Sequence, residues 1–118
     1  MNKPEGSVKT VDVKADLPTA DQALRRLVAA IDTGRLTGAT AVKIVHGYGS
    51  TGKGGKIRTE SRRLLEDLRR KGKIRDFLPG EEFSIFHAAT LRAFERCPAL
   101  RRDSDLDQHN NGITIILL

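Results

Sequence analysis

The stretch Val42–Gly55, VKIVHGYGSTGKGG, decides how the rest of the chain folds. Its first part is apolar and predicts a buried strand that ends at His46. Five of the next nine residues are glycine, and a helical pattern follows from Lys56. A strand, a glycine-rich turn and a helix in this order bring backbone N–H groups together with the positive end of a helix dipole. We therefore expect a phosphate-binding cradle here, flanked by His46, Lys53 and Lys56.

The segments around this stretch alternate between strand and helix patterns. Thr19 with Gln22 three residues later is a capping-box signal for a helix start, and Gly34 is the expected end of that helix. The expected elements are a strand over Val8–Lys14, a helix from Thr19 to Gly34, a strand over Ala41–His46, a helix from Lys56 to Lys71, a strand over Ile74–Leu78, a helix over Ser84–Cys97 and a strand over Ile113–Leu118.

This order predicts an α/β fold, as a two-layer sandwich of β-α-β-α-β-(insertion)-β order. It has a four-stranded mixed sheet and two main helices, which a right-handed crossover places on one face. We expect a single domain over 1–118, with a flexible lead-in at 1–6 and an insertion at 79–111 that holds one helix. The ends of the first two strands, with Asp12, Lys14 and His46, should meet at one sheet edge, where ligands bind in such folds.

The net charge of +6 is concentrated in one segment. Lys53–Lys73 holds nine basic and three acidic residues, and nine minus three is +6, so the other residues sum to zero. At about 100° per residue, Arg58, Arg62 and Arg69 lie on one flank of the helix beside its apolar stripe. A positive excess confined to one helix indicates a polyanionic partner, so we expect these arginines to contact nucleic acid.

Composition limits the remaining function classes. With 118 residues, 38% hydrophobic and 31% charged, the chain predicts one soluble domain, and no apolar run is long enough to span a bilayer. The start, MNKPEGSVK, lacks the apolar block of a secretory signal. The single cysteine, Cys97, cannot form an internal disulfide and is expected in the core. We therefore expect a cytoplasmic protein without a membrane partner.

The glycine-rich stretch also matches two nucleotide-binding motifs in part. Gly47–Gly52, GYGSTG, fits G-x-G-x-x-G, but Lys53–Gly55 is expected to prolong the loop, whereas in a dinucleotide site the helix starts within the glycines. The stretch is close to a P-loop as well, although Gly54 stands where a magnesium-binding hydroxyl is needed. A small-nucleotide binder therefore remains one hypothesis.

Three segments together resemble a known family. V-D-V-K at Val11–Lys14, H-G-Y-G at His46–Gly49 and N-G-I-T-I-I-L-L at Asn111–Leu118 resemble the Smr (small MutS-related) domain. Its two hallmark motifs are L-D-x-H on the first strand and H-G-x-G on the second. Lys14 departs from the first motif, because it stands where that motif has histidine.

The resemblance implies a nucleic-acid-binding domain, in many members an endonuclease that nicks DNA or cleaves RNA. Repair, recombination and RNA or ribosome quality control are the processes it suggests, and the fold it implies is similar to the C-terminal domain of translation initiation factor three. Carried over by position, Asp12 matches the aspartate of the first motif, and His46, Gly47 and Gly49 match the second.

Phosphodiester cleavage needs charge stabilisation and a proton shuttle. Glycine-loop amides with Lys53 or Lys56 would supply the first, and His46, oriented by Asp12, would supply the second. Lys14 cannot shuttle protons at neutral pH unless its pKa is strongly depressed, but it binds phosphate as a point charge. Asp12 and His46 are too few ligands for a dedicated divalent-metal site, so no metal or other cofactor is expected, and the metal requirement of any cleavage stays open.

Three hypotheses follow from the sequence. The first is an Smr-like domain that grips the backbone of DNA or RNA and is a candidate endonuclease. The second, motivated by Lys14, is a non-catalytic nucleic-acid- or protein-binding module whose insertion 79–111 contacts a partner. The third is the nucleotide binder. Tyr48 is the only aromatic residue near the loop and a candidate for stacking on a base, and nothing in the sequence favours DNA over RNA.

Overall fold

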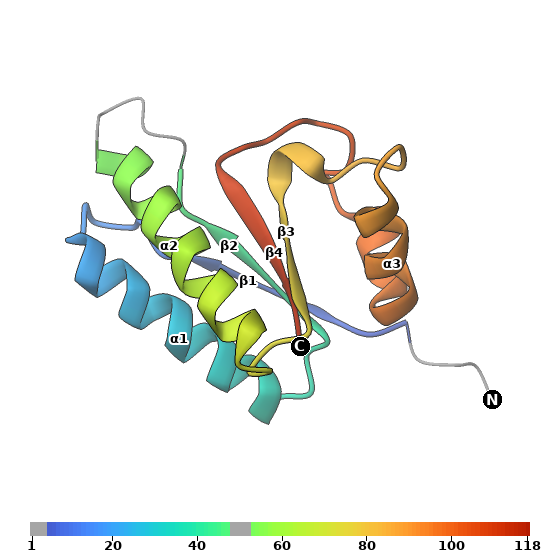
Figure 1. Ribbon diagram of the computed structural model, residues 1–118, viewed down its shortest axis with the longest axis horizontal. Helices are drawn as coiled ribbons and strands as arrows, with labels where there is room; N and C mark the ends of the chain where they lie inside the picture. The colour runs from blue at the N-terminus through green and yellow to red at the C-terminus, as the bar shows by residue number, and fades with distance from the viewer. Residues whose placement is uncertain (1–4, 48–52) are drawn as a thin grey trace.

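A four-stranded mixed sheet forms the centre of the molecule, in the order β1-β2-β4-β3 (Figure 1). Strands β1 and β2 are parallel, and β4 runs antiparallel to β2 and β3. The computed structural model describes residues 5–47 and 53–118, without the side chains of residues 53 and 54. The sequence-based prediction of an α/β fold with such a sheet is confirmed. The strands are β1 (Val8–Asp12), β2 (Ala41–Val45), β3 (Asp76–Pro79) and β4 (Ile113–Leu117).

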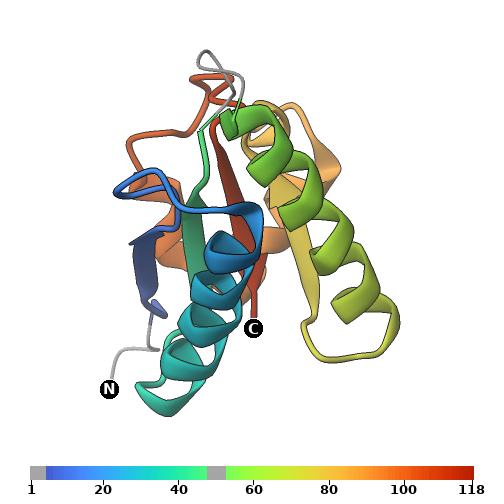
Figure 2. The ribbon, with the colours of Figure 1, turned by 90° about the vertical axis from the view of Figure 1, so that its left-hand side faces the viewer.

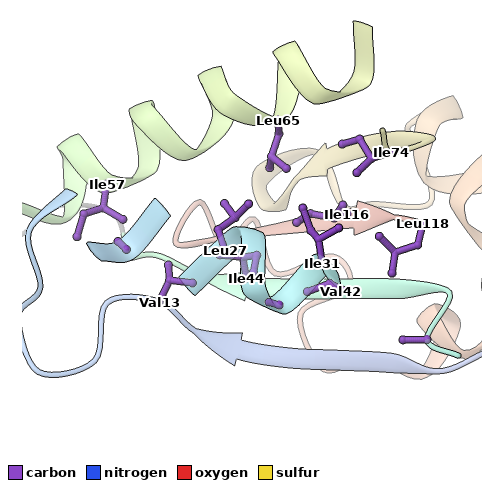
Figure 3. Packing of buried hydrophobic residues seen from close by; sticks show 13 residues of the cluster. Val13, Leu27, Ile31, Val42, Ile44, Ile57, Leu65, Ile74, Ile116 and Leu118 are labelled. Atoms are coloured by element: carbon purple, nitrogen blue, oxygen red, sulfur yellow. The ribbon is translucent and has the colours of Figure 1, made fainter. Parts of the chain in front are cut away.

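Two long helices, α1 (Ala20–Leu36) and α2 (Lys53–Arg70), cover one face of the sheet, as expected from a right-handed crossover (Figure 2). Their apolar stripes meet alternate residues of the strands, because successive side chains of a strand point to opposite faces. Figure 3 shows this core. Its labelled members are Val13, Leu27, Ile31, Val42, Ile44, Ile57, Leu65, Ile74, Ile116 and Leu118.

Helix α1 begins as predicted and ends later than predicted. Thr19 accepts from the backbone N–H of Gln22, and the Gln22 side chain accepts from the backbone N–H of Thr19, which is a complete capping box. Gly34 does not end the helix. It is buried inside it, where a Cβ would lie 3.0 Å from Val42 Cγ2, so glycine lets the helix approach the sheet closely.

Helix α2 begins at Lys53, three residues before the predicted start at Lys56. Gly54 and Gly55 therefore belong to its first turn, which corrects the expectation that they prolong the loop. The predicted stop is in place: Gly72 has φ +71°, and the N–H of Lys73 bonds to the carbonyl of Leu68.

The inserted segment packs against the opposite face of the sheet and adds a third layer to the predicted sandwich (Figures 1 and 2). It contains η1 (Gly80–Glu82), α3 (Ala88–Arg96) and η2 (Pro98–Arg102). Helix α3 is shorter than the predicted Ser84–Cys97, because Ser84 closes a turn by accepting from the backbone N–H of His87 and, through its side chain, from that of Phe86. Phe83 and Phe94 meet edge to face in the second core.

A buried cluster of one lysine and two aspartates connects the insertion to the sheet. Lys43 of β2 donates to both oxygens of Asp103, at 2.9 and 3.2 Å, and to Asp105 at 2.5 Å. Burial by itself would lower the pKa of Lys43, but the hydrogen bonds to Asp105 and Asp103 outweigh it and raise that pKa. The insertion is therefore held by charge as well as by its apolar core.

The insertion also exposes apolar side chains. Phe86 is 89% exposed, and Ile85 and Leu91 are about half exposed. Contact of 79–111 with a protein partner stays a prediction. None of the helices within the described ranges combines the length and apolar composition needed to cross a bilayer.

The predicted flexible lead-in lies partly outside the described residues, which begin at Glu5. Glu5 pairs with Arg102 of η2, and its carbonyl accepts from the N–H of Ala99.

Candidate nucleic-acid interface

Most residues of the predicted site lie at one edge of the sheet. Strands β1, β2 and β3 run the same way, so their C-terminal ends lie together with the start of β4 and of helix α2 (Figure 2). Ligands bind at this edge in open α/β sheets. Lys14, His46, Gly47, Glu81 and Thr114 come from these four strand ends.

Lys14 and Gly47 are neighbours at this edge. Gly47 has φ +76°, and a Cβ added to it would lie 3.1 Å from Cδ of Lys14, so the aliphatic part of the lysine covers the glycine. Asp12 accepts from the backbone N–H of Lys14 at 2.9 Å and from its Nζ at 3.3 Å. Both side chains are 45% exposed, so this is a solvated ion pair of small energetic value, from which the lysine can turn to another anion.

His46 is fully buried, and both of its ring nitrogens have partners. Nδ1 lies 2.8 Å from the carbonyl oxygen of Gly47, which can only accept, so Nδ1 carries the proton. Nε2 of the neutral ring is then an acceptor, and it receives the hydroxyl proton of Thr114 at 2.8 Å. The same hydroxyl accepts from Nε of Arg62 at 3.2 Å. One hydrogen-bonded chain therefore joins Arg62, Thr114, His46 and Gly47.

The surroundings of His46 favour its neutral form. Burial lowers the pKa of the imidazole to about 4, the bond to Gly47 works against this, and the charges of Arg62 and Arg58 lower the pKa further. Glu81 acts in the opposite direction. At neutral pH the ring holds its neighbours in place and has no proton to give from Nε2.

The expected contact between Asp12 and His46 was wrong. Asp12 pairs in register with Val45, and the His46 side chain emerges one residue later. Because side chains alternate between faces, His46 lies on the side of α1 and α2 with Ile44, whereas Asp12 lies on the side of the insertion with Val45. Asp12 cannot orient the imidazole from there; Thr114 and Gly47 do so.

Carboxylates of the chain bind two of the three predicted arginines. Arg62 donates a fork to Glu81, with Nη1–Oε2 at 2.8 Å and Nη2–Oε1 at 2.6 Å. Arg69 pairs with Glu66 and Asp76, and its guanidinium lies 5.9 Å from the ring centre of Phe77. Two members of the arginine flank therefore meet carboxylates of η1 and β3.

Lys56 and Arg58 differ from the cations that follow them in the sequence. Further along α2, Arg63 pairs with Glu60, while Arg70 and Lys71 share Asp67. Within the described part of the chain, no ion pair includes Lys56 or Arg58. The carboxylates of α2 therefore leave Lys56 and Arg58 uncompensated. Both residues lie in the first turns of the helix, at the site edge.

Three predicted binding residues cannot be placed. Tyr48 and Gly49 lie outside the described residues, and so does the side chain of Lys53. Over 5–47 and 53–118, no group of three or more His, Cys, Asp or Glu side chains could hold a metal ion.

Sequence reasoning missed Thr114 and Glu81. A threonine inside the apolar run Ile113–Leu118 was the available signal, because a buried hydroxyl needs a partner. No sequence pattern indicated Glu81, since its pairing with Arg62 depends on where β3 ends relative to α2.

The comparison with protein families identifies the chain. Searches of curated proteins and of solved structures returned no match, so the likeness to the C-terminal domain of translation initiation factor three stays a prediction. A family model for the Smr domain matches residues 16–84, more than half of the chain. The matched part includes His46–Gly49 and α2, and it excludes Val11–Lys14. That family is generally linked to nucleic-acid binding and nuclease activity. With its sheet edge, its buried motif histidine and its basic helix, this chain belongs to the Smr domain family.

Proposed function

We propose that this protein binds the phosphate backbone of DNA or RNA at the edge formed by the ends of β1 and β2 and the first turns of α2. Lys14, Lys56 and Arg58 are the cations that contact phosphate. Family membership supports nucleic acid as the polyanion. Such contacts are largely independent of sequence and depend strongly on salt.

The distribution of ion pairs is the observation that carries this proposal. Arg63, Arg70 and Lys71 have carboxylate partners on α2 itself, whereas Lys56 and Arg58 have none among the described residues. The N-terminal end of a helix also favours anions through its dipole. Charge and dipole therefore act in the same direction at the first turns of α2.

Binding of labelled duplex and single-stranded oligonucleotides tests the proposal. Replacing Lys56 and Arg58 together by glutamine should reduce the slope of log affinity against log salt by about 1.8 for a duplex, since each lost phosphate contact contributes about 0.9. Lys73→Gln is the matched control, because Lys73 is exposed, lies just beyond the other end of α2 and has no ion pair within the described ranges. An equal effect of Lys73→Gln would contradict the proposal.

The geometry of His46 favours binding without cleavage by this residue. To act as a general base, Nε2 would have to leave the Thr114 hydroxyl, and the ring would have to reach solvent from a fully buried position. The alternative is the endonuclease activity linked to the family. A plasmid-nicking assay with and without chelator decides between them: nicking by the wild type that is lost in His46→Ala, while binding persists, would establish the nuclease instead.

A further inference from the structure

Glu81 holds Arg62 in the geometry that a guanidinium uses for phosphate. The two parallel bonds, at 2.8 and 2.6 Å, form a fork that carboxylates and phosphates accept alike. Arg62 is fixed from behind by its bonds to the Thr114 hydroxyl at 3.2 Å and to the carbonyl oxygen of Ile113 at 3.3 Å. The guanidinium is therefore already oriented toward an anion.

This pair lies at the proposed nucleic-acid surface. Arg62 is joined to Gly47 through Thr114 and His46, and Arg58 stands one helical turn before it. Partial burial works to raise the pKa of Glu81, but the hydrogen bonds and charge of Arg62, with the charge of Arg58, hold it below its usual value. Two cations thus act on one carboxylate at this edge.

Exposure differs between the two partners. The Glu81 side chain is 41% exposed and that of Arg62 is 20% exposed. Glu81 belongs to η1, a single short turn after β3, and is the more exposed partner of the pair. Arg62 keeps its bonds to Thr114 and Ile113 without the carboxylate, so its orientation does not depend on Glu81 alone.

We propose that Glu81 occupies a phosphate subsite on Arg62 and competes there with the nucleic-acid backbone. The inserted segment, through this one residue, lowers the affinity of the surface and reserves Arg62 for a ligand that displaces the carboxylate. This inference rests on the proposed function, since it concerns the same edge and the same ligand class.

Glu81→Gln is the direct test, because it keeps the size of the side chain and removes its charge. One more phosphate contact should steepen the salt slope for a duplex by about 0.9 and raise affinity roughly eightfold at about 0.1 M salt. Asp67→Asn is the matched control, since Asp67 also pairs with an arginine of α2, Arg70, but at the end of the helix away from this edge. The double variant Arg62→Gln, Glu81→Gln should lose the gain.

The outcomes separate this inference from the proposed function. Affinity that Glu81→Gln leaves at the wild-type value, or a gain of the same size in Asp67→Asn or in the double variant, would overturn the subsite and leave the proposed function standing. Absence of binding in every variant would overturn both. A measurement on the wild type tests the subsite without any variant that could misfold. Added oligonucleotide should shift the NMR signals of the Arg62 Nε–H and of the Glu81 carboxyl carbon. If these signals do not move when the protein is bound, the subsite is overturned.

Discussion

The hydroxyl of Thr114 donates a 2.8 Å hydrogen bond to Nε2 of His46, and this contact joins the start of β4 to the end of β2. The motif histidine is therefore part of the sheet edge as much as of the loop that follows it. Its other nitrogen holds the carbonyl of Gly47, beside which Lys14 lies. The arrangement makes His46 a support for the surface that we propose binds phosphate.

Replacing Thr114 by valine should show the value of this contact. The variant keeps the shape of the side chain but leaves Nε2 of His46 and Nε of Arg62 without that partner, which should cost about 1–3 kcal/mol of unfolding free energy. Thr114→Ser keeps the hydroxyl and should retain the Nδ1–H form of the imidazole, as read from its ¹⁵N NMR signals. A valine variant with the same ¹⁵N signals and unchanged stability would refute this role of Thr114.

Stability should fall with acid before the carboxylates titrate. The pKa of His46 is about 4 in the folded protein against an ordinary 6.5, so the folded state holds the neutral ring. Its contribution is complete above pH 6.5 and is lost as the pH falls toward 4. Between about pH 7.5 and 5 the loss should be about 2 kcal/mol by proton linkage. Denaturant titrations at both pH values measure it, and the His46→Gln variant should lack this part of the pH dependence.

Lys43→Met should strongly destabilise the protein. It leaves the carboxylates of Asp103 and Asp105 next to the sheet without their counter-ion, and breaking such a buried pair typically costs about 3–5 kcal/mol. The triple variant Lys43→Met, Asp103→Asn, Asp105→Asn should recover much of that loss. Chemical denaturation of the three proteins measures the effect; a loss below about 1 kcal/mol would mean that the apolar core alone holds the insertion.

Ser61→Ala should be neutral or stabilising. The Ser61 hydroxyl is fully buried in α2 and has no hydrogen-bond partner among the described residues. Alanine removes the unsatisfied group and is the better helix former, so a gain of about 0.5–1 kcal/mol is expected. Thermal or denaturant unfolding checks it, and a clear loss of stability would show that the hydroxyl is bonded.

Local patterns were enough to predict most of the fold. Thr19 and Gln22 marked the start of α1, and Gly72 marked the end of α2, because caps and stops depend on a few neighbouring residues. The prediction that Gly34 ends α1 is wrong, since its burial against Val42 is a tertiary contact that no local pattern contains. The sequence predicts the start of α2 too late, because Gly54 and Gly55 are typical of loops, whereas the helix already begins at Lys53.

The candidate site was predictable in position but not in its contacts. Asp12 and His46 do end neighbouring strands, yet strand register puts them on opposite faces, and register follows from the packing of the whole sheet. Likewise, Arg62 and Arg69 were correctly placed on a helix flank that in the fold faces carboxylates from distant segments, Glu81 and Asp76. Helical spacing shows which residues share a face but not what that face meets.

The proposed function places nucleic-acid phosphate at the sheet edge that holds Lys14, Gly47 and the first turns of α2. Amide NMR spectra of the labelled protein, recorded during titration with a short oligonucleotide at about 50 mM salt, locate the bound phosphate residue by residue, because weak backbone contacts persist at low salt. The largest shifts should fall on Lys14, Gly47 and Arg58, with little change at Leu36 or Arg96. Shifts concentrated on α3, or no shifts at all, would contradict it.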